Sequence, residues 1–270
     1  SSRLGCCAAG PSHGARSAAA KRAGCSLQGS SALLQTGMFR PVRVRGLQRP
    51  YSVDQLTVLV LHPIVSVWYG ALCAITLSSS KLVPALVPFA ALNVAVLSLW
   101  GYVGWVDPSE EGGPSMPCSK ARQEVHHYCP TCRKSVRGFD HHCTWLNTCI
   151  CARNYVHFYS LAVLGTILYF FMVAVAVLVL VLLDGQDFED ALGNEQAGMV
   201  LWGLLSALAG WIGLSFASLA GFHTYLVCRG TGTYEWVLEQ GQRRQEARAR
   251  KRAKRESRDR ALSQAAPAVP

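Results

Sequence analysis

Four long hydrophobic stretches dominate the pattern of residues along the chain. They cover Leu56–Leu77, a second run that follows Ser78-Ser79-Ser80-Lys81 and ends at Val106, a third at Phe158–Leu183, and a fourth at roughly Ala197–Val227. A helix rises about 1.5 Å per residue, so about 20 apolar residues cross a hydrocarbon core about 30 Å thick. Each stretch is long enough. The pattern therefore predicts an all-α polytopic membrane protein with four transmembrane helices.

A polar, cysteine-rich segment separates the second stretch from the third. We expect a leader-like or disordered segment at 1–37, helices 1 and 2 within 38–106, and a small cysteine-rich domain at 107–157. Helices 3 and 4 then occupy 158–228, and a basic tail covers 229–270. The residues before Met38 are rich in Ala, Ser, Gly and Arg, which leaves two starts open, Ser1 and Met38; we favour Met38.

The positive charges lie on one side of the predicted helices. The formal net charge is +10, and ten Lys or Arg residues lie between Arg243 and Arg260. The connection between the third and fourth stretches is acidic and has no basic residue. By the positive-inside rule, both termini and the cysteine-rich domain are cytosolic. Arginines beside membrane spans favour an anionic membrane over nucleic acid as a partner, although the tail can also be a solvated basic segment.

The cysteine-rich segment carries ligands at spacings that suit zinc. Cys129 and Cys132 form a Cys-x2-Cys knuckle, and His142 and Cys149 follow closely enough to complete a Cys3His tetrahedron. On the cytosolic side thiols stay reduced, so metal binding is favoured over disulfides. Four unrelated residues are the alternative, but a small polar domain needs a cross-link to hold its shape. We predict a zinc site.

The run Asp140-His141-His142-Cys143 adds a candidate nucleophile next to that site. Only a thiolate attacks, so Cys143 needs a base; His141 can take its proton and Asp140 can orient His141. For these neighbours to reach one another, we expect a sharply folded loop. The alternative is that all four residues contribute to metal sites and none is catalytic.

These residues resemble the DHHC protein S-acyltransferase (palmitoyltransferase) family. The similarity covers roughly Met38 to Gln240 and includes further motifs: Asp107-Pro108, the Cys149/Asn154/Phe158 series, and Gly232-Thr233-Tyr234-Glu235 in place of the family's Thr-Thr-x-Glu. The resemblance implies that Cys143 is the acylated nucleophile, with Asp140 and His141 as its activating partners. It also implies that Cys129, Cys132, His142 and Cys149 bind zinc.

The chain departs from the family at its other zinc site. The ligand positions there correspond to Ser115, Cys118, Tyr128 and Ser135, so only Cys118 is retained. We therefore expect one zinc ion and a degenerate second site, either empty or rebuilt with His127 and Cys118. Thr144 replaces the usual proline.

The resemblance implies a ping-pong acyltransferase. A long-chain acyl-CoA such as palmitoyl-CoA acylates Cys143, and the acyl group then passes to cysteines of membrane-proximal proteins. Lys134 and Arg153 are among the candidates for the CoA headgroup by charge alone. We expect an endomembrane (Golgi or ER) or plasma-membrane location. Two alternatives stay open: a zinc-stabilised membrane scaffold with weak catalysis, and a membrane-anchored zinc-finger adaptor.

Overall fold

The computed structural model describes residues 42–110 and 126–265. All of them belong to one unit, Pro41–Pro270. The predicted segment 1–37, Met38, Ser115 and Cys118 lie outside the described residues.

Four helices are long and apolar enough to cross a membrane: α1 (Val53–Thr76), α2 (Ser79–Trp105), α4 (Tyr155–Leu182) and α6 (Glu195–Cys228). Each begins and ends within three residues of a hydrophobic stretch identified from the sequence. The prediction of an all-α polytopic membrane protein with four transmembrane helices is therefore confirmed at this level. A further helix, α7 (Thr233–Ala265), covers most of the basic tail.

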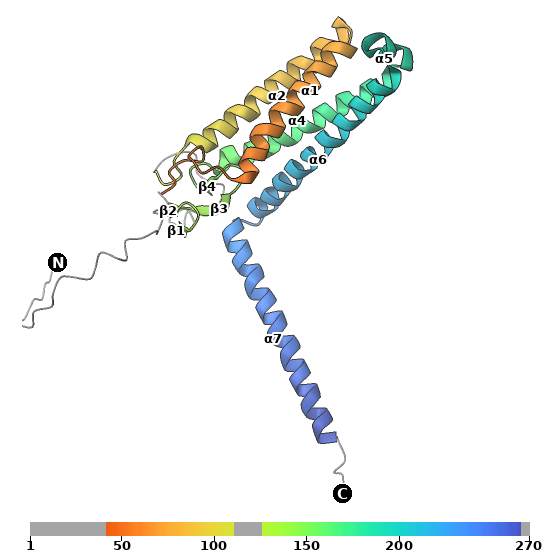
Figure 1. Ribbon diagram of the computed structural model, residues 1–270. Coiled ribbons are helices and arrows are strands. Elements are labelled where there is room, and N and C mark those ends of the chain that lie inside the picture. Colours follow the sequence, from red (N-terminus) through yellow and green to blue (C-terminus); the bar gives the residue numbers. More distant parts are fainter. Residues whose placement is uncertain (1–41, 111–125, 266–270) are drawn as a thin grey trace, which may run out of the picture. The chain divides into compact units, whose positions relative to one another are not determined.

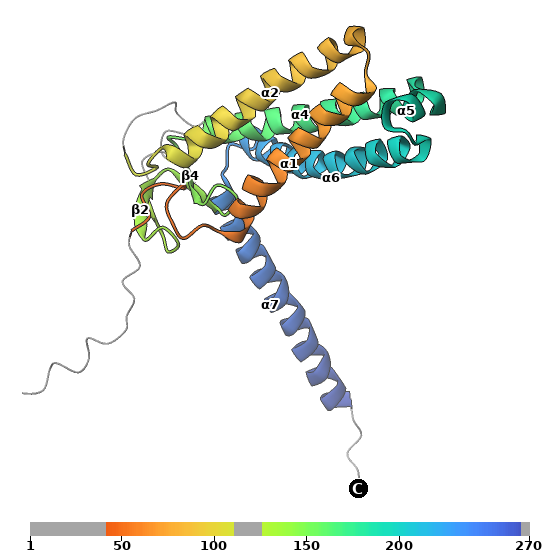
Figure 2. The same cartoon turned by 45° about the horizontal axis from the view of Figure 1, so that its top comes forward.

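The four long helices run side by side, and α4 packs against both α2 and α6 (Figure 1). A short helix that the sequence did not predict, α5 (Gly185–Leu192), occupies the acidic connection. It starts with a capping box between Asp184 and Asp187, and Gly193 ends it in the left-handed region at φ 71°. Figure 2 shows α5 at the end of the bundle away from the β-strands.

The interior and the outer surface of this bundle are both apolar. Trp202, Tyr69 and Leu168 are fully buried, and the Tyr69 and Trp202 rings meet edge to face at 6.4 Å. On the outside, Val67 and Val181 are 71% and 73% exposed. Such large exposed apolar surfaces are rare on proteins in water and are expected against lipid. The burial pattern thus agrees with a membrane environment.

Glycines set the close approach of α4 and α6. A Cβ on Gly165 of α4 would lie 2.6 Å from the Phe216 ring of α6, and a Cβ on Gly213 would lie 3.3 Å from Tyr169. Small residues at such positions let membrane helices pack by van der Waals contact. By contrast, Gly203 and Gly221 of α6 face open space within 4 Å.

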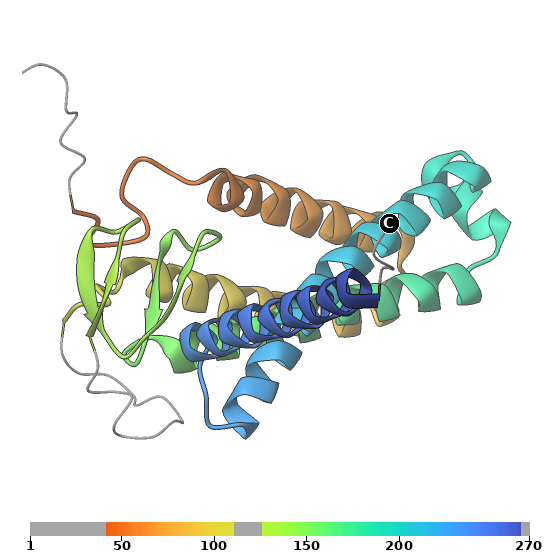
Figure 3. The ribbon, with the colours of Figure 1, turned by 90° about the horizontal axis from the view of Figure 1, so that it is seen from below.

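The described part of the cysteine-rich domain contains two antiparallel hairpins, which the sequence pattern did not predict. The first pairs β1 (His126–Cys129) with β2 (Lys134–Arg137), and the second pairs β3 (Phe139–Cys143) with β4 (Thr148–Cys151). Figure 3 shows both hairpins at the end of the bundle where α2 ends and α4 begins. Along the chain, the domain therefore lies between α2 and α4, the second and third membrane helices, as predicted.

The α4–α6 contact can be tested with a matched pair of substitutions. Gly165→Ala places a methyl group against Phe216, and such overpacking costs about 1–3 kcal/mol. Gly203→Ala meets nothing and gains helix propensity. Thermal unfolding of the two detergent-solubilised variants should show a lower midpoint for Gly165→Ala and an unchanged or higher midpoint for Gly203→Ala. Equal midpoints would contradict the packing described for α4 and α6.

Candidate active site and metal cluster

The pairing of β3 with β4 separates the four residues Asp140–Cys143 by face. His142 pairs with Cys149, whereas His141 pairs with Ile150 and Cys143 with Thr148. Because side chains alternate along a strand, His141 and Cys143 share one face of β3 and His142 occupies the other. The two histidines therefore have different surroundings although they are adjacent in the sequence.

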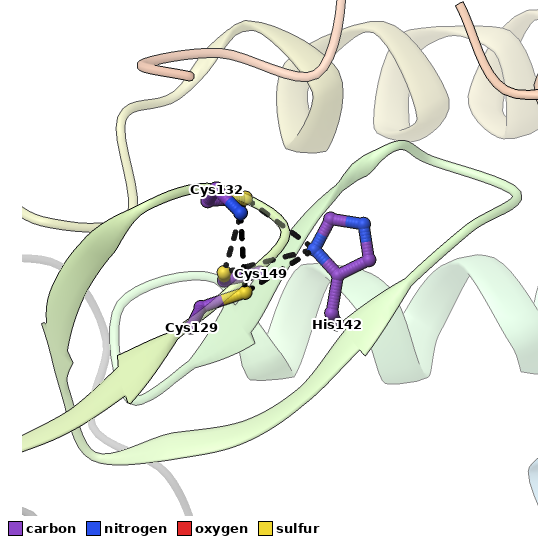
Figure 4. A group of neighbouring side chains, drawn as sticks. All are labelled: Cys129, Cys132, His142 and Cys149. Carbon is purple, nitrogen blue, oxygen red and sulfur yellow. Dashed lines mark hydrogen bonds between the residues drawn. The ribbon is translucent and has the colours of Figure 1, made fainter. Parts of the chain in front are cut away.

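The face that carries His142 holds a metal-binding type of cluster. The ligand atoms of Cys129, Cys132, His142 and Cys149 all lie within 4.8 Å of one another. Nδ1 of His142 is 3.3 Å from the Cys132 sulfur, 3.7 Å from the Cys129 sulfur and 3.9 Å from the Cys149 sulfur. Figure 4 shows the three sulfurs and this nitrogen turned toward a common centre. The structure thus brings together all four residues predicted as ligands.

The dimensions of the cluster suit zinc. Zinc bonds of about 2.3 Å to sulfur and about 2.0 Å to nitrogen give a tetrahedron with S···N edges of about 3.5 Å and S···S edges of about 3.8 Å. The S···N distances are 3.3–3.9 Å, and the Cys132 and Cys149 sulfurs are 3.4 Å apart. The edges agree with the tetrahedron within about half an ångström. The residues present therefore fit a zinc ion.

The thiols of the cluster influence one another strongly. Hydrogen bonds with Cys129 and Cys132 raise the pKa of Cys149, and the bond with Cys129 raises the pKa of Cys132 to about 11. Hydrogen bonds from Cys132 and Cys149 lower the pKa of Cys129. The Cys129 thiol is therefore the most acidic of the three. A metal ion would be bound by all three as thiolates.

A tight turn brings the two knuckle cysteines together. The backbone N–H of Cys132 donates to the Cys129 sulfur at 3.4 Å, and that of Arg133 donates to the Cys129 carbonyl at 2.7 Å. Arg133 adopts the left-handed conformation at φ 60°, which turns the chain back into β2. The knuckle predicted from the Cys-x2-Cys spacing is therefore a defined turn between β1 and β2.

On the other face, Asp140 reaches His141 through a bulge in β3. The register shifts between Phe139 and His141, so Asp140 is the extra residue. Bulges re-aim side chains in this way, often beside active sites. Nδ1 of His141 donates to Oδ2 of Asp140 at 2.8 Å. The expectation of a sharply folded loop is corrected here: the segment is an extended, bulged strand.

His141 lies beside Cys143 on the same face of β3. Burial lowers the pKa of His141, but the hydrogen bond with Asp140 and the interaction with Cys143 raise it by more, to about 9. The Cys143 side chain is only 9% exposed and belongs to the same buried cluster as Phe158 and Leu161 of α4. The sulfur lies at the edge of the apolar core.

Three residues that support this face were not identified as site residues from the sequence. Thr233 begins α7; its Oγ1 donates to Oδ2 of Asp140 at 2.6 Å and its N–H donates to Oδ1 at 3.1 Å. His223 of α6 is hydrogen-bonded to the Tyr155 hydroxyl at 3.1 Å, and its ring lies 5.5 Å from that of His141. The Thr-Thr-x-Glu-like motif signalled Thr233, and a histidine near the end of a membrane span signalled His223, although a structural role was favoured for it. Nothing in the local sequence pointed to Tyr155.

Two asparagines connect the second hairpin to neighbouring helices by hydrogen bonds. Asn154 accepts from the N–H of Cys151 at 2.9 Å and donates to the Cys149 carbonyl at 3.0 Å, which closes the end of β4. Asn147 donates to Gln55 of α1 at 3.0 Å. The second hairpin is therefore tied both to the start of α4 and to α1.

The residues at the positions of the family's other zinc site are arranged differently from the Cys/His cluster. Tyr128 and Ser135 face each other across β1 and β2, and Tyr128 is 61% exposed. The His127 ring packs on the Tyr234 ring at 4.3 Å. Among the described residues these positions form no metal-binding group, and Cys118 lies outside those residues.

Two basic side chains considered for a CoA headgroup are engaged in ion pairs. Lys134 Nζ is 2.6 Å from Asp107, and Arg153 is 2.9 Å from Glu110. Burial raises and the bond from Lys134 lowers the pKa of Asp107, with a net lowering. Within the cysteine-rich domain, these pairs connect β2 and the residues after β4 to the segment that follows α2.

Comparison with known proteins supports the resemblance to the DHHC palmitoyltransferases. Residues 114–240 match the family model described as DHHC palmitoyltransferase. The chain is 33% identical over 125 residues to palmitoyltransferase erf2 of Emericella nidulans, which is 44% of this chain and 20% of the relative. It is 37% identical over 119 residues to palmitoyltransferase ZDHHC18 of Rattus norvegicus, which is 44% of this chain and 30% of the relative. It is also 36% identical over 146 residues to probable protein S-acyltransferase 20 of Arabidopsis thaliana, or 48% of this chain and 21% of the relative.

The chain thus spans less than a third of the length of these curated relatives. The matched region nevertheless contains β1–β4, α4, α6 and the first turns of α7, which together form the site. The resemblance identified from the sequence is confirmed for residues 114–240, which are similar to the DHHC palmitoyltransferase domain.

Proposed function

We propose that this protein is a protein S-acyltransferase that transfers a long-chain acyl group from acyl-CoA to cysteines of membrane-proximal proteins. One observation carries the proposal: Cys143 and His141 share the face of β3 that turns toward the apolar core, while His142 faces the metal cluster. A thiol with its own base, separated from the metal ligands and beside the membrane helices, suits acyl transfer.

In the proposed first half-reaction, Nε2 of His141 takes the proton of the Cys143 thiol, because Nδ1 is held by Asp140. The Cys143 thiolate attacks the thioester carbonyl of the acyl-CoA. The bond to the CoA sulfur breaks, and the CoA thiolate leaves with the proton from His141. In the second half-reaction a substrate cysteine loses its proton to His141 and attacks the acyl-Cys143 thioester. Free Cys143 is then regenerated.

The apolar surroundings of Cys143 explain why such a reaction belongs in a membrane. Each buried CH₂ group contributes about 0.8 kcal/mol, so a long acyl chain resists transfer from lipid to water. The sulfur belongs to the same buried cluster as the helix core, so the carbonyl can reach it while the chain stays in apolar surroundings. Positioning and a deprotonated thiol are the main contributions asked of the protein.

We also propose that Cys129, Cys132, His142 and Cys149 hold one zinc ion and that the second site is degenerate. When bound, zinc cross-links the knuckle to the second hairpin and so holds β3 in position. The distribution of Lys and Arg supports a cytosolic location for the domain and for both termini. An endomembrane or plasma-membrane location is part of this proposal.

The acyl-enzyme can be tested by autoacylation. We expect wild-type protein incubated with labelled palmitoyl-CoA to acquire a hydroxylamine-labile label, and Cys143→Ser to lose it while keeping its metal. Cys228, an exposed cysteine at the end of α6, offers the matched control. Cys228→Ser should label normally. Wild-type labelling of Cys143→Ser would overturn the mechanism and favour a scaffold role.

The metal cluster can be tested by elemental analysis with two buried cysteines of β4. Cys149→Ser should lose the zinc ion and unfold at lower temperature, because it removes one of four ligands. Cys151 is equally buried, but its sulfur donates to the Pro108 carbonyl at 3.4 Å and lies outside the cluster. Cys151→Ser should retain one ion per chain. Two zinc ions in the wild-type protein would contradict the degenerate second site.

The support of Asp140 by α7 can be tested at Thr233. Thr233→Val removes the hydroxyl bond to Asp140 but keeps the backbone bond. Hydrogen bonds to charged groups contribute about 1.5–3 kcal/mol, so autoacylation should be at least about tenfold slower. Thr233→Ser should restore the rate, and zinc content should be unchanged in both variants. Equal autoacylation rates for Thr233→Val and Thr233→Ser would show that the hydroxyl bond does not position Asp140.

A further inference from the structure

The charges of α7 are segregated around the helix. Successive residues of a helix are rotated by about 100°, which places eight basic residues in one arc of about 160°. This basic face consists of Arg243, Arg244, Arg248, Arg250, Lys251, Lys254, Arg255 and Arg258. All five acidic residues of the helix fall outside the arc: Glu235, Glu239, Glu246, Glu256 and Asp259. A solvated tail has no physical need for such a separation.

The remaining basic residues of the tail are compensated on the other side of the helix. Arg252 lies 2.9 Å and Arg260 lies 3.9 Å from Glu256. All side chains from Gly241 to Leu262 are exposed. On the basic face itself, Arg243 lies 2.6 Å from Glu239. The helix therefore presents a largely positive strip along one side and a mixed surface along the other.

The first turn of α7 fixes the direction of the basic face. Trp236, which lies about 40° from the middle of the basic arc, packs on Phe222 of α6 with ring centroids 5.2 Å apart. Tyr234 lies on the opposite side and packs on His127 and Phe139 of the cysteine-rich domain. At its start, the helix thus turns its basic side toward the last membrane span.

The connection to that span is short. α6 ends at Cys228 and α7 begins at Thr233, so four residues separate them. Four extended residues reach at most about 14 Å. The start of α7 is therefore held close to the membrane surface, and the basic face begins ten residues later, at Arg243. Any anionic lipid in that leaflet is a permanent neighbour, whereas an acidic protein or a nucleic acid has to arrive by diffusion.

We propose that the basic face of α7 binds the anionic phospholipid headgroups of the leaflet in which α6 ends. Polybasic helices next to a span gain attraction from each Lys or Arg that comes near an anionic surface, and the attraction falls off within a Debye length. This role does not depend on the acyl transfer proposed above, because no residue of the basic face belongs to that site.

Protease protection in nanodiscs tests the proposal with the full chain. Discs of phosphatidylcholine alone are compared with discs that also contain phosphatidylserine, and α7 is cleaved with a protease specific for glutamate. Glu246 and Glu256 are the cleavage sites next to the basic residues and remain in every variant. Fragment masses distinguish cleavage there from cleavage at Glu235 and Glu239. We expect cleavage at least about tenfold slower in the anionic discs, and we expect this protection to disappear at about 1 M salt.

A matched pair of double variants tests the face itself. Arg250→Gln with Lys254→Gln removes two charges from the basic face, and Arg252→Gln with Arg260→Gln removes two from the other side. Each variant is scored by its own ratio of cleavage rates in the two kinds of disc. The first pair should lose most of the protection and the second should keep it.

Three results would overturn the proposal. One is equal cleavage of the wild-type chain in both discs. Another is equal loss of protection in the two double variants, which would assign the effect to net charge rather than to a face. The third is protection by soluble polyglutamate or RNA but not by phosphatidylserine, which would give the basic face a different partner.

Discussion

The site depends on the pairing of β3 with β4, because a strand gives neighbouring residues opposite faces. His142 pairs with Cys149 and joins the metal cluster, while His141 and Cys143 turn to the apolar side. A helix or an open loop would not separate adjacent side chains so completely. The bulge at Asp140 is the one departure from this alternation, and it brings the carboxylate to the imidazole on the reactive side.

Asp140 also links the hairpins to the C-terminal helix α7. It is fully buried, and a buried carboxylate is costly unless donors satisfy it. Two of those donors come from Thr233 at the start of α7, ninety-three residues away. On the other side of the site, the Thr144 hydroxyl donates to Asp54 at the start of α1, and the Ser52 hydroxyl donates to the Thr144 carbonyl. Bundle and hairpins thus position each other, and a strained loop is not needed to hold the thiol.

The membrane explains the two surfaces that look out of place on a water-soluble protein. The apolar exterior of α1, α2, α4 and α6 suits lipid tails, and the basic face of α7 suits lipid headgroups. Between them lies Cys143, in contact with the helix core. The acyl transfer proposed for this chain needs a substrate that has both an apolar chain and an anionic head. The molecule offers an environment for each.

The sequence by itself determined the four apolar spans and the Cys-x2-Cys knuckle, and it singled out the four residues of the Cys/His cluster and the segment Asp140–Cys143. Hydrophobic length and ligand spacing are local properties, so residues such as Cys129 and Cys132 could be read directly. Only the tertiary structure decided that the segment is a bulged strand and that Thr233, His223 and Tyr155 support it. Strand register and contacts between distant elements arise from the packing of the whole chain, and no local pattern encodes them.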